Sequence, residues 1–262
     1  MPRVIAIIPA RLASSRFPGK PLVAISGVPL VEHVRRRALL SPVVDDAIVA
    51  TCDTEIMETV TGAGGHAVLT SDRHERCTTR VEEAMHHFEA DVVIIVQGDE
   101  PLIRPDMLDL AASPLLEHAG IDCVNVLSPI VGDGDLADTS IVKTAVDQKG
   151  FILFYSRALI PVYQKPGLCP IYRQTGIIAF RLAFLREYTT MPETPFERVE
   201  SIDMLRVLEH GRRVAGVVTQ HVSIGVDYPR DVKRVEKILA GDPDQRAIHD
   251  RIQQKVSEVR RC

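Results

Sequence analysis

The sequence predicts an α/β fold with a mostly parallel sheet, and three observations support this. Short apolar runs alternate with helical segments through the first half of the chain, which is the pattern of strand–helix–strand units. Several of these runs are apolar at almost every position, as in strands that helices cover on both faces. From residue 121 onward, strand-like runs follow one another with only short polar turns between them, which predicts an antiparallel extension.

The first 119 residues supply the regular alternation. The run Val92–Val96 contains only Val and Ile, which favour strands. A crossover between parallel strands is almost always right-handed, so one parallel sheet accommodates all of these units. We predict strands over 4–8, 47–51, 66–69 and 91–96, and helices over 28–40, 55–61, 79–88 and 105–118.

The remainder of the chain is predicted to add strands over 124–129, 141–147, 151–155, 176–180 and 214–219. A helix over 182–188 precedes a long helix over 194–208. Thr194 as N-cap, Pro195 at the first position and Glu197 at the third form a capping-box pattern. A further helix follows residue 226, and the residues from 241 form a terminal helix or a tail. The expected buried stripe of the long helix is Val199, Ile202, Leu205 and Leu208.

Composition excludes several classes of protein. A length of 262 residues fits one large α/β domain, and 45% hydrophobic residues suffice for its core. The net charge of -4, with both signs interspersed, predicts no bulk attraction to nucleic acid or to an anionic membrane. The five cysteines include no CxxC pair, no apolar run reaches the roughly 20 residues of a membrane span, and the chain starts on a core strand. We therefore expect a cytoplasmic protein with reduced thiols.

A cationic loop directly follows the first predicted strand. Arg11, Arg16 and Lys20 lie in it among small residues and prolines. Small residues let backbone N–H groups approach an anion, while Arg and Lys bind phosphate oxygens. Open α/β sheets bind ligands at the carboxyl ends of their strands. The loop therefore predicts a polyphosphate site, with a solvated basic turn as the alternative. The second basic run, 35–37, is interpreted as a solvated helix face.

A carboxylate follows the strand that ends at Val96. Asp99 stands in the sequence Gln-Gly-Asp-Glu-Pro, and Gly98 permits a turn that directs Asp99 toward the phosphate site. A carboxylate in this position is suited to hold Mg²⁺ between the protein and nucleotide phosphates. The alternative is an ordinary polar turn that caps a strand.

The loop at 8–22 and the turn at 97–101 resemble the signature motifs of the 3-deoxy-manno-octulosonate (Kdo) cytidylyltransferases, and the resemblance covers nearly the whole chain. It implies a Rossmann-like nucleotidyltransferase sheet whose antiparallel extension serves sugar binding and dimerisation. The implied reaction transfers CMP from CTP to the anomeric hydroxyl of a 2-keto-3-deoxy sugar acid and releases pyrophosphate. CTP, an acidic acceptor, Mg²⁺ and a second copy in a homodimer are the implied partners.

The resemblance also assigns regions and residues. Residues 1–262 form one domain, in which 1–119 mainly bind nucleotide, 120–180 form the extension and 181–262 complete the core. Lys20, Asp99 and Asp227 are the implied catalytic residues, and the two aspartates hold the metal. The implied acceptor contacts are Gln97, Lys143, Arg157, Gln174 and Glu200. The implied nucleotide contacts are Pro9, Ala10, Arg11, Arg16, Lys20, Thr51, Asp53, Arg76, Thr78 and Arg80.

Two segments depart from the family's motifs. Residues 74–80 read His-Glu-Arg-Cys-Thr-Thr-Arg where the family has His-x-Ser-Gly-Thr-Glu-Arg. Arg76 and Cys77 are expected to change the base pocket or to add a phosphate contact. Residues 173–178 read Arg-Gln-Thr-Gly-Ile-Ile against the family's Arg-His-Leu-Gly-Ile-Tyr. Gln174 and Ile178 predict a less polar and less cationic acceptor pocket that handles Kdo poorly.

The residues leave other functions open. A different ulosonic acid or a phosphonate is the alternative acceptor, and sequence drift without functional change is the alternative to altered specificity. A nucleotidyltransferase that uses UTP or another NTP would share the first loop. A non-catalytic nucleotide-binding module would keep the loop but lose the two aspartates. A Rossmann dehydrogenase would fit the sheet but not the cationic loop.

Overall fold

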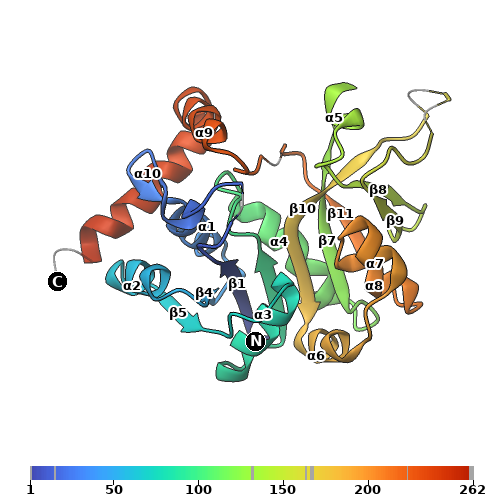
Figure 1. Cartoon of the computed structure of the whole chain (residues 1–262), viewed down its shortest axis with the longest axis horizontal. Coiled ribbons are helices and arrows are strands. Elements are labelled where there is room, and N and C mark those ends of the chain that lie inside the picture. The colour runs from blue at the N-terminus through green and yellow to red at the C-terminus, as the bar shows by residue number, and fades with distance from the viewer. Residues whose placement is uncertain are drawn as a thin grey trace.

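The protein is a three-layer α/β structure (Figure 1). The computed structural model describes residues 2–259, apart from 15, 131, 132, 163, 166, 167 and 223. In these residues a nine-stranded sheet has the order β11-β7-β10-β6-β1-β4-β5, and β8 and β9 extend it from β10. Its strands are β1 (Val4–Ala10), β4 (Asp46–Thr51), β5 (His66–Leu69), β6 (Val92–Val96), β7 (Cys123–Pro129), β8 (Lys143–Val146), β9 (Ile152–Ser156), β10 (Tyr172–Arg181) and β11 (Ala215–Val218).

Helices cover both faces of this sheet. On one face, α1 and α4 contribute buried residues such as Val34 and Leu108 to the core. On the other face, α3, α6 and α8 contribute residues such as Val81 and Leu205. The helices are α1 (Leu30–Ala38), α2 (Thr54–Gly62), α3 (Cys77–Ala84), α4 (Pro105–Glu117), α5 (Asp133–Ala137), α6 (Leu182–Thr190), α7 (Pro195–Glu200), α8 (Met204–Glu209), α9 (Pro229–Gly241) and α10 (Pro243–Val259).

The register confirms the predicted fold class. β1 pairs in parallel with β4 on one side and with β6 on the other, so the loops after these strands begin at one edge of the sheet. β10 lies antiparallel between β6 and β7, and it continues into the antiparallel pair β8 and β9. The predicted strand at 176–180 is thus half of a longer strand that joins the parallel sheet to its extension. No helix in the described ranges has the length and apolarity needed to cross a bilayer.

The basic run at 35–37 is buried, so its interpretation as a solvated face is wrong. Arg35 and Arg36 both donate to the carboxylate of Glu32, which is itself fully buried. Arg37 donates to the Ile103 carbonyl and to Gln245 Oε1 at 2.7 Å. Gln245 belongs to α10, which lies beside α1 (Figure 1) and removes this face from water. The predicted helix over 28–40 also starts later, because 28–29 form the short strand β3 (Val28–Pro29), which pairs with β2 (Ala24–Ile25).

The predicted long helix over 194–208 is wrong, because Ser201 adopts a left-handed conformation (φ 53°) and separates α7 from α8. The break lets Arg206 turn back onto Glu197, with two nitrogen–oxygen distances of 2.7 Å. In a continuous helix these residues would face opposite sides, about 13 Å apart along the axis. Glu197 is fully buried, so this bidentate pair satisfies a charge that would otherwise lack a partner. Val199 of the expected buried stripe is 84% exposed.

We predict that acid destabilises the fold through His33 of α1. Burial, with a smaller contribution from the nearby Arg37, lowers the pKa of His33 to about 3 against the raising effect of the hydrogen bond to the Ile25 carbonyl. Below about pH 6.5 the unfolded chain therefore binds a proton at His33 that the folded chain does not bind. The free energy of unfolding falls from about pH 6.5 toward pH 3. Denaturant unfolding at pH 7.5 and 5.0 should show a loss of about 2 kcal/mol from this group.

The matched variant is His33→Gln, which keeps a donor for the Ile25 carbonyl but does not titrate. Its stability should change less between the two pH values than that of the wild-type protein. Parallel pH curves for the two proteins would contradict the assignment to His33.

Candidate active site

The cationic loop is held in place by backbone and carboxylate contacts. β1 ends at Ala10, and the backbone N–H of Leu12 then donates to Asp53 Oδ2 at 2.7 Å. The Leu12 carbonyl accepts from Ser14 and Gly19, which closes the loop on itself. Gly19 has a φ of 72°, a left-handed conformation that suits glycine, and it starts the short 3-10 helix Lys20–Leu22. Asp53, expected to contact nucleotide, thus supports the loop from the segment between β4 and α2.

The loop cations pair with the two predicted metal-binding aspartates. Lys20 Nζ lies 2.8 Å from Asp99 Oδ2 and also donates to the Val226 carbonyl at 2.8 Å. Arg16 lies 2.9 Å from Asp227 Oδ1. The Val226 N–H donates to the Asp99 carbonyl, so the segment that carries Asp227 is fixed beside Asp99. Residues from three distant parts of the chain therefore meet at the carboxyl ends of β1 and β6.

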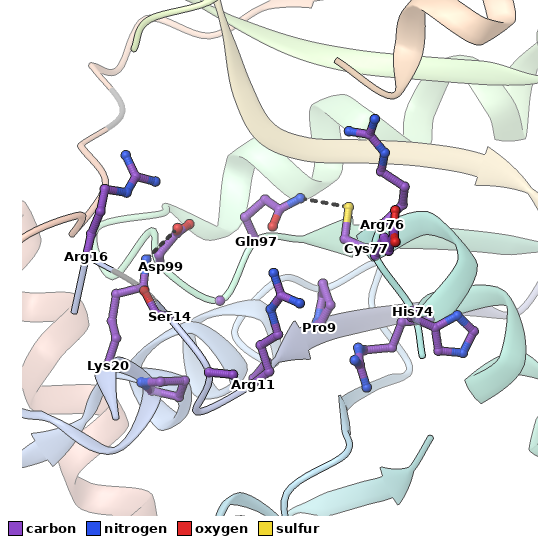
Figure 2. A pocket seen from close by; sticks show the side chains of 16 residues that line it. Pro9, Arg11, Ser14, Arg16, Lys20, His74, Arg76, Cys77, Gln97 and Asp99 are labelled. Carbon is purple, nitrogen blue, oxygen red and sulfur yellow. Dashed lines mark hydrogen bonds and ion pairs between the residues drawn. The ribbon is translucent and has the colours of Figure 1, made fainter. Parts of the chain in front are cut away.

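A cavity of about 340 Å³ lies over this cluster (Figure 2). All the cations of the loop line it, and Arg80 of α3 lines its other side, where it donates to Thr70 Oγ1. Most of the predicted nucleotide contacts lie here. The predicted site residues that line this cavity are Pro9, Ala10, Arg11, Arg16, Lys20, Arg76, Arg80, Gln97 and Asp99.

A second cavity of about 470 Å³ adjoins the first, and Arg16, Arg76, Cys77, Gln97 and Asp99 line both. Its walls come from β10, from the segment between α7 and α8, and from the residues around Asp227. Arg157, Gln174 and Ile178 line this second cavity. We call it the acceptor-side cavity and the first one the nucleotide-side cavity.

Gln97 stands between the two cavities, and its neighbours fix its position. Its Nε2 donates to the Cys77 sulfur at 3.1 Å, and its backbone N–H donates to the Gly176 carbonyl at 2.9 Å. A Cβ at Gly176 would lie 2.5 Å from Gln97 Cβ, so only glycine fits beside this side chain. Glu100 accepts from the Gly176 N–H at 2.7 Å and fixes the opposing strand. The departure at Cys77 therefore contacts the residue that divides the site.

Asp203 is a part of the site that the sequence did not indicate. Its Oδ2 accepts from Thr78 at 2.9 Å and from Cys77 at 3.6 Å, and its Oδ1 lies 3.4 Å from Arg76. Burial raises the pKa of Asp203. Burial and the nearby Asp203 together raise the pKa of Cys77, so this cysteine remains a neutral thiol. The sequence placed Asp203 inside the predicted helix over 194–208, and only the break at Ser201 brings it to α3.

Several predicted contacts lie behind the cavity walls. Lys143 is fully buried, and its ammonium donates to the carbonyls of Asp138 and Arg157. Burial lowers the pKa of Lys143. The Glu200 carboxylate accepts from Ser156 Oγ and from the Arg157 N–H, both at 2.9 Å. Two further predicted contacts, Thr51 and Thr78, are also fully buried and line neither cavity. Thr51 Oγ1 accepts from the Asp53 N–H, and Thr78 Oγ1 donates to Asp203.

The donor set fits a magnesium ion that nucleotide phosphates help to hold. Asp99 and Asp227 offer hard carboxylate oxygens on the wall of the acceptor-side cavity, where it adjoins the nucleotide side. Over the described residues, no group of three or more His, Cys, Asp or Glu side chains is arranged to hold a metal ion. Mg²⁺ commonly takes one or two protein carboxylates and completes its shell with phosphates and water. These two aspartates match that pattern and not an all-protein cage.

Known proteins agree with this geometry. A family model described as cytidylyltransferase matches residues 5–214. The 3-deoxy-manno-octulosonate cytidylyltransferase of Syntrophotalea carbinolica is 38% identical over 247 residues, covering 91% of this chain and 99% of the relative. That of Geobacter metallireducens is 40% identical over 249 residues, covering 91% and 98%.

A solved structure of CMP:2-keto-3-deoxy-manno-octonic acid synthetase complexed with CTP superposes with a TM-score of 0.86 at 34% identity. The superposition covers 91% of this chain and 98% of that one. The share of the chain and the level of identity show the family. The chain belongs to the 3-deoxy-manno-octulosonate cytidylyltransferases.

Proposed function

We propose that the protein transfers CMP from CTP to the anomeric hydroxyl of Kdo and releases pyrophosphate. The observation that carries the proposal is the pairing of Lys20 with Asp99 and of Arg16 with Asp227 where the two cavities meet. A magnesium–triphosphate complex matches both halves of these pairs, because its phosphates attract the cations and its metal attracts the carboxylates. Relatives at 38–40% identity are Kdo cytidylyltransferases, which supports Kdo as the acceptor.

Transfer of a nucleotidyl group depends on positioning and on neutralising negative charge. Arg11, Arg16 and Lys20 hold the β- and γ-phosphates and offset the charge that grows on the departing pyrophosphate. Asp99 and Asp227 would hold Mg²⁺, which supplies a Lewis acid at the α-phosphate when it is bound. Gln97 stands at the boundary of the two cavities and orients the acceptor that enters from the other side.

The alternatives fit the residues less well. A non-catalytic nucleotide-binding module needs no pair of carboxylates opposite its phosphate-binding cations, yet Asp99 and Asp227 both stand there. A dinucleotide-dependent dehydrogenase needs a glycine-rich turn after the first strand, and this chain has three cations in that place. A different acidic acceptor is consistent with Gln174 and Ile178, which both line the acceptor-side cavity.

A pyrophosphate-release screen tests the function directly. The protein should release pyrophosphate with CTP, Mg²⁺ and Kdo, and much less with ATP, GTP or UTP. Values of kcat/KM for Kdo, other ulosonic acids and phosphonates also decide whether Gln174 and Ile178 make Kdo a poor acceptor, which stays a prediction. If none of the four NTPs gives pyrophosphate release with any acceptor, the proposal is contradicted.

We expect Asp99→Asn and Asp227→Asn to lower kcat by on the order of 100-fold or more, because the developing phosphate charge loses its metal-mediated stabilisation. Binding of CTP without Mg²⁺ should be kept or strengthened, since each change removes a negative charge beside the triphosphate. Calorimetry without and with Mg²⁺ measures the second effect. Asp250→Asn, at an exposed position of α10, is the control. Wild-type turnover in either variant would remove that aspartate from the mechanism.

We further propose that the extension forms a homodimer. β9 and α7 each expose a large apolar side chain, Leu153 at 61% and Phe196 at 51%. Phe154 packs edge-on against Phe196 with ring centroids 5.6 Å apart, so this apolar surface is ordered. Such a surface on a sheet extension suits contact with a second copy. Light scattering should give about twice the chain mass, and Leu153→Glu with Phe196→Glu should give the single-chain mass. A wild-type monomer would contradict this.

A further inference from the structure

Arg76 is one of the residues in which this site departs from the motif that its sequence resembles, and its position has a specific use. We propose that Arg76 binds the carboxylate of the acceptor and thereby selects acidic acceptors. This deepens the proposed function and rests on it, because it concerns the same acceptor-side cavity. It also replaces the expectation that Arg76 adds a phosphate contact or alters the base pocket.

The other basic residues on this side are already engaged. Arg157 donates through Nε to the Glu200 carbonyl at 2.7 Å and through one terminal nitrogen to the Thr139 carbonyl at 3.1 Å. Its terminal nitrogens also reach the carbonyls of Ser140 and Ser201 at 3.4 and 3.5 Å. Backbone oxygens therefore use its donors.

Lys143 and Arg16 are no better placed for an acceptor carboxylate. Lys143 is fully buried behind the wall and bonds two backbone carbonyls. Arg16 pairs with Asp227 and, in the proposed function, turns to the phosphates of CTP. Among the cations that line the acceptor-side cavity in the described ranges, Arg76 is thus the one that neither backbone carbonyls nor, in the proposed function, the phosphates of CTP engage.

Among the described residues, Arg76 donates hydrogen bonds through only one of its terminal nitrogens. Its terminal nitrogen NH1 donates to Ser201 Oγ at 3.1 Å and lies 3.4 Å from Asp203 Oδ1, while Nε is 4.0 Å from Glu193. Within the described part of the chain, no other hydrogen bond from its guanidinium is present. The side chain is 20% exposed and lines both cavities. A planar guanidinium fixed in this way can still present a pair of donors to a carboxylate.

The direction of the side chain favours the acceptor over CTP. Figure 2 shows Arg76 extending away from Arg11 and Lys20, on the side of the site where Cys77 and Gln97 meet. Its anchors, Ser201 and Asp203, line the acceptor-side cavity and not the nucleotide-side one. Asp203 contacts Arg76 through Oδ1 alone, because its Oδ2 accepts from Thr78 and Cys77. This contact uses NH1 of Arg76 and leaves the second terminal nitrogen for a ligand.

A carboxylate-deletion experiment tests this role. The wild-type protein should use Kdo at least about tenfold better than its methyl ester, because a charge-assisted hydrogen bond is lost with the ester. Arg76→Gln should raise KM for Kdo by about 10–100-fold with little change in KM for CTP, and it should use acid and ester almost equally. Arg76→Lys keeps the charge without the fork, so its KM for Kdo should lie between the two. Arg186→Gln, at an exposed position of α6, is the matched control.

A merely structural Arg76, present to balance the buried Asp203, would give a different result. Arg76→Gln would then lower thermal stability and slow acid and ester by the same factor, and the inference would fail. A rise in KM for CTP with unchanged KM for Kdo would overturn it as well and return Arg76 to the nucleotide. If the wild-type protein itself consumes no Kdo with CTP, the proposed function fails. If the wild-type protein consumes Kdo with CTP and Arg76→Gln has the same kinetic constants, the inference fails and the proposed function stands.

Discussion

The ion pair between Lys20 and Asp99 is the interaction on which the site depends. It joins the loop after β1 to the turn after β6, two neighbouring parallel strands, across 79 residues of sequence. Lys20 also reaches the Val226 carbonyl, which draws the chain that carries Asp227 to the same place. With side chains 13% and 36% exposed, the pair is open enough for a charged ligand to replace it. The charges neutralise each other here, and in the proposed function a metal–phosphate complex takes the place of both partners.

The acceptor side depends on a buried carboxylate instead. Asp203 gathers Thr78, Cys77 and Arg76, which are all residues of the segment that departs from its family's motif. Cys77 in turn contacts Gln97, the residue between the two cavities. A change at one of these positions therefore alters its neighbours, because each polar group in the network satisfies another in a poorly hydrated place. The break between α7 and α8 makes this network possible.

The terminal helix plays a supporting part far from the chemistry. α10 packs beside α1 (Figure 1). His249 of α10 stacks on His33 of α1 with ring centroids 5.2 Å apart. Arg37 donates to Gln245 Oε1, and Nε2 of the same amide donates to the carbonyl of Leu102, three residues beyond Asp99. The helix that follows the cationic loop and the turn that holds Asp99 thus share one partner. This contact stabilises the relative placement of the two segments that form the phosphate site.

The sequence alone determined the alternation of strands and helices, the cationic loop and the carboxylate at 99, while Asp227 came from the resemblance to a known family. These features are local, since strand and helix patterns depend on neighbouring residues and ligands bind at strand ends in open α/β sheets. Only the tertiary structure decided which cations remain available. Arg157 and Lys143 are engaged by carbonyls of their surroundings, Arg35 to Arg37 are covered by a helix 200 residues later, and Asp203 reaches α3 through a helix break. Burial and partner choice are set by contacts between distant segments, which no local pattern encodes.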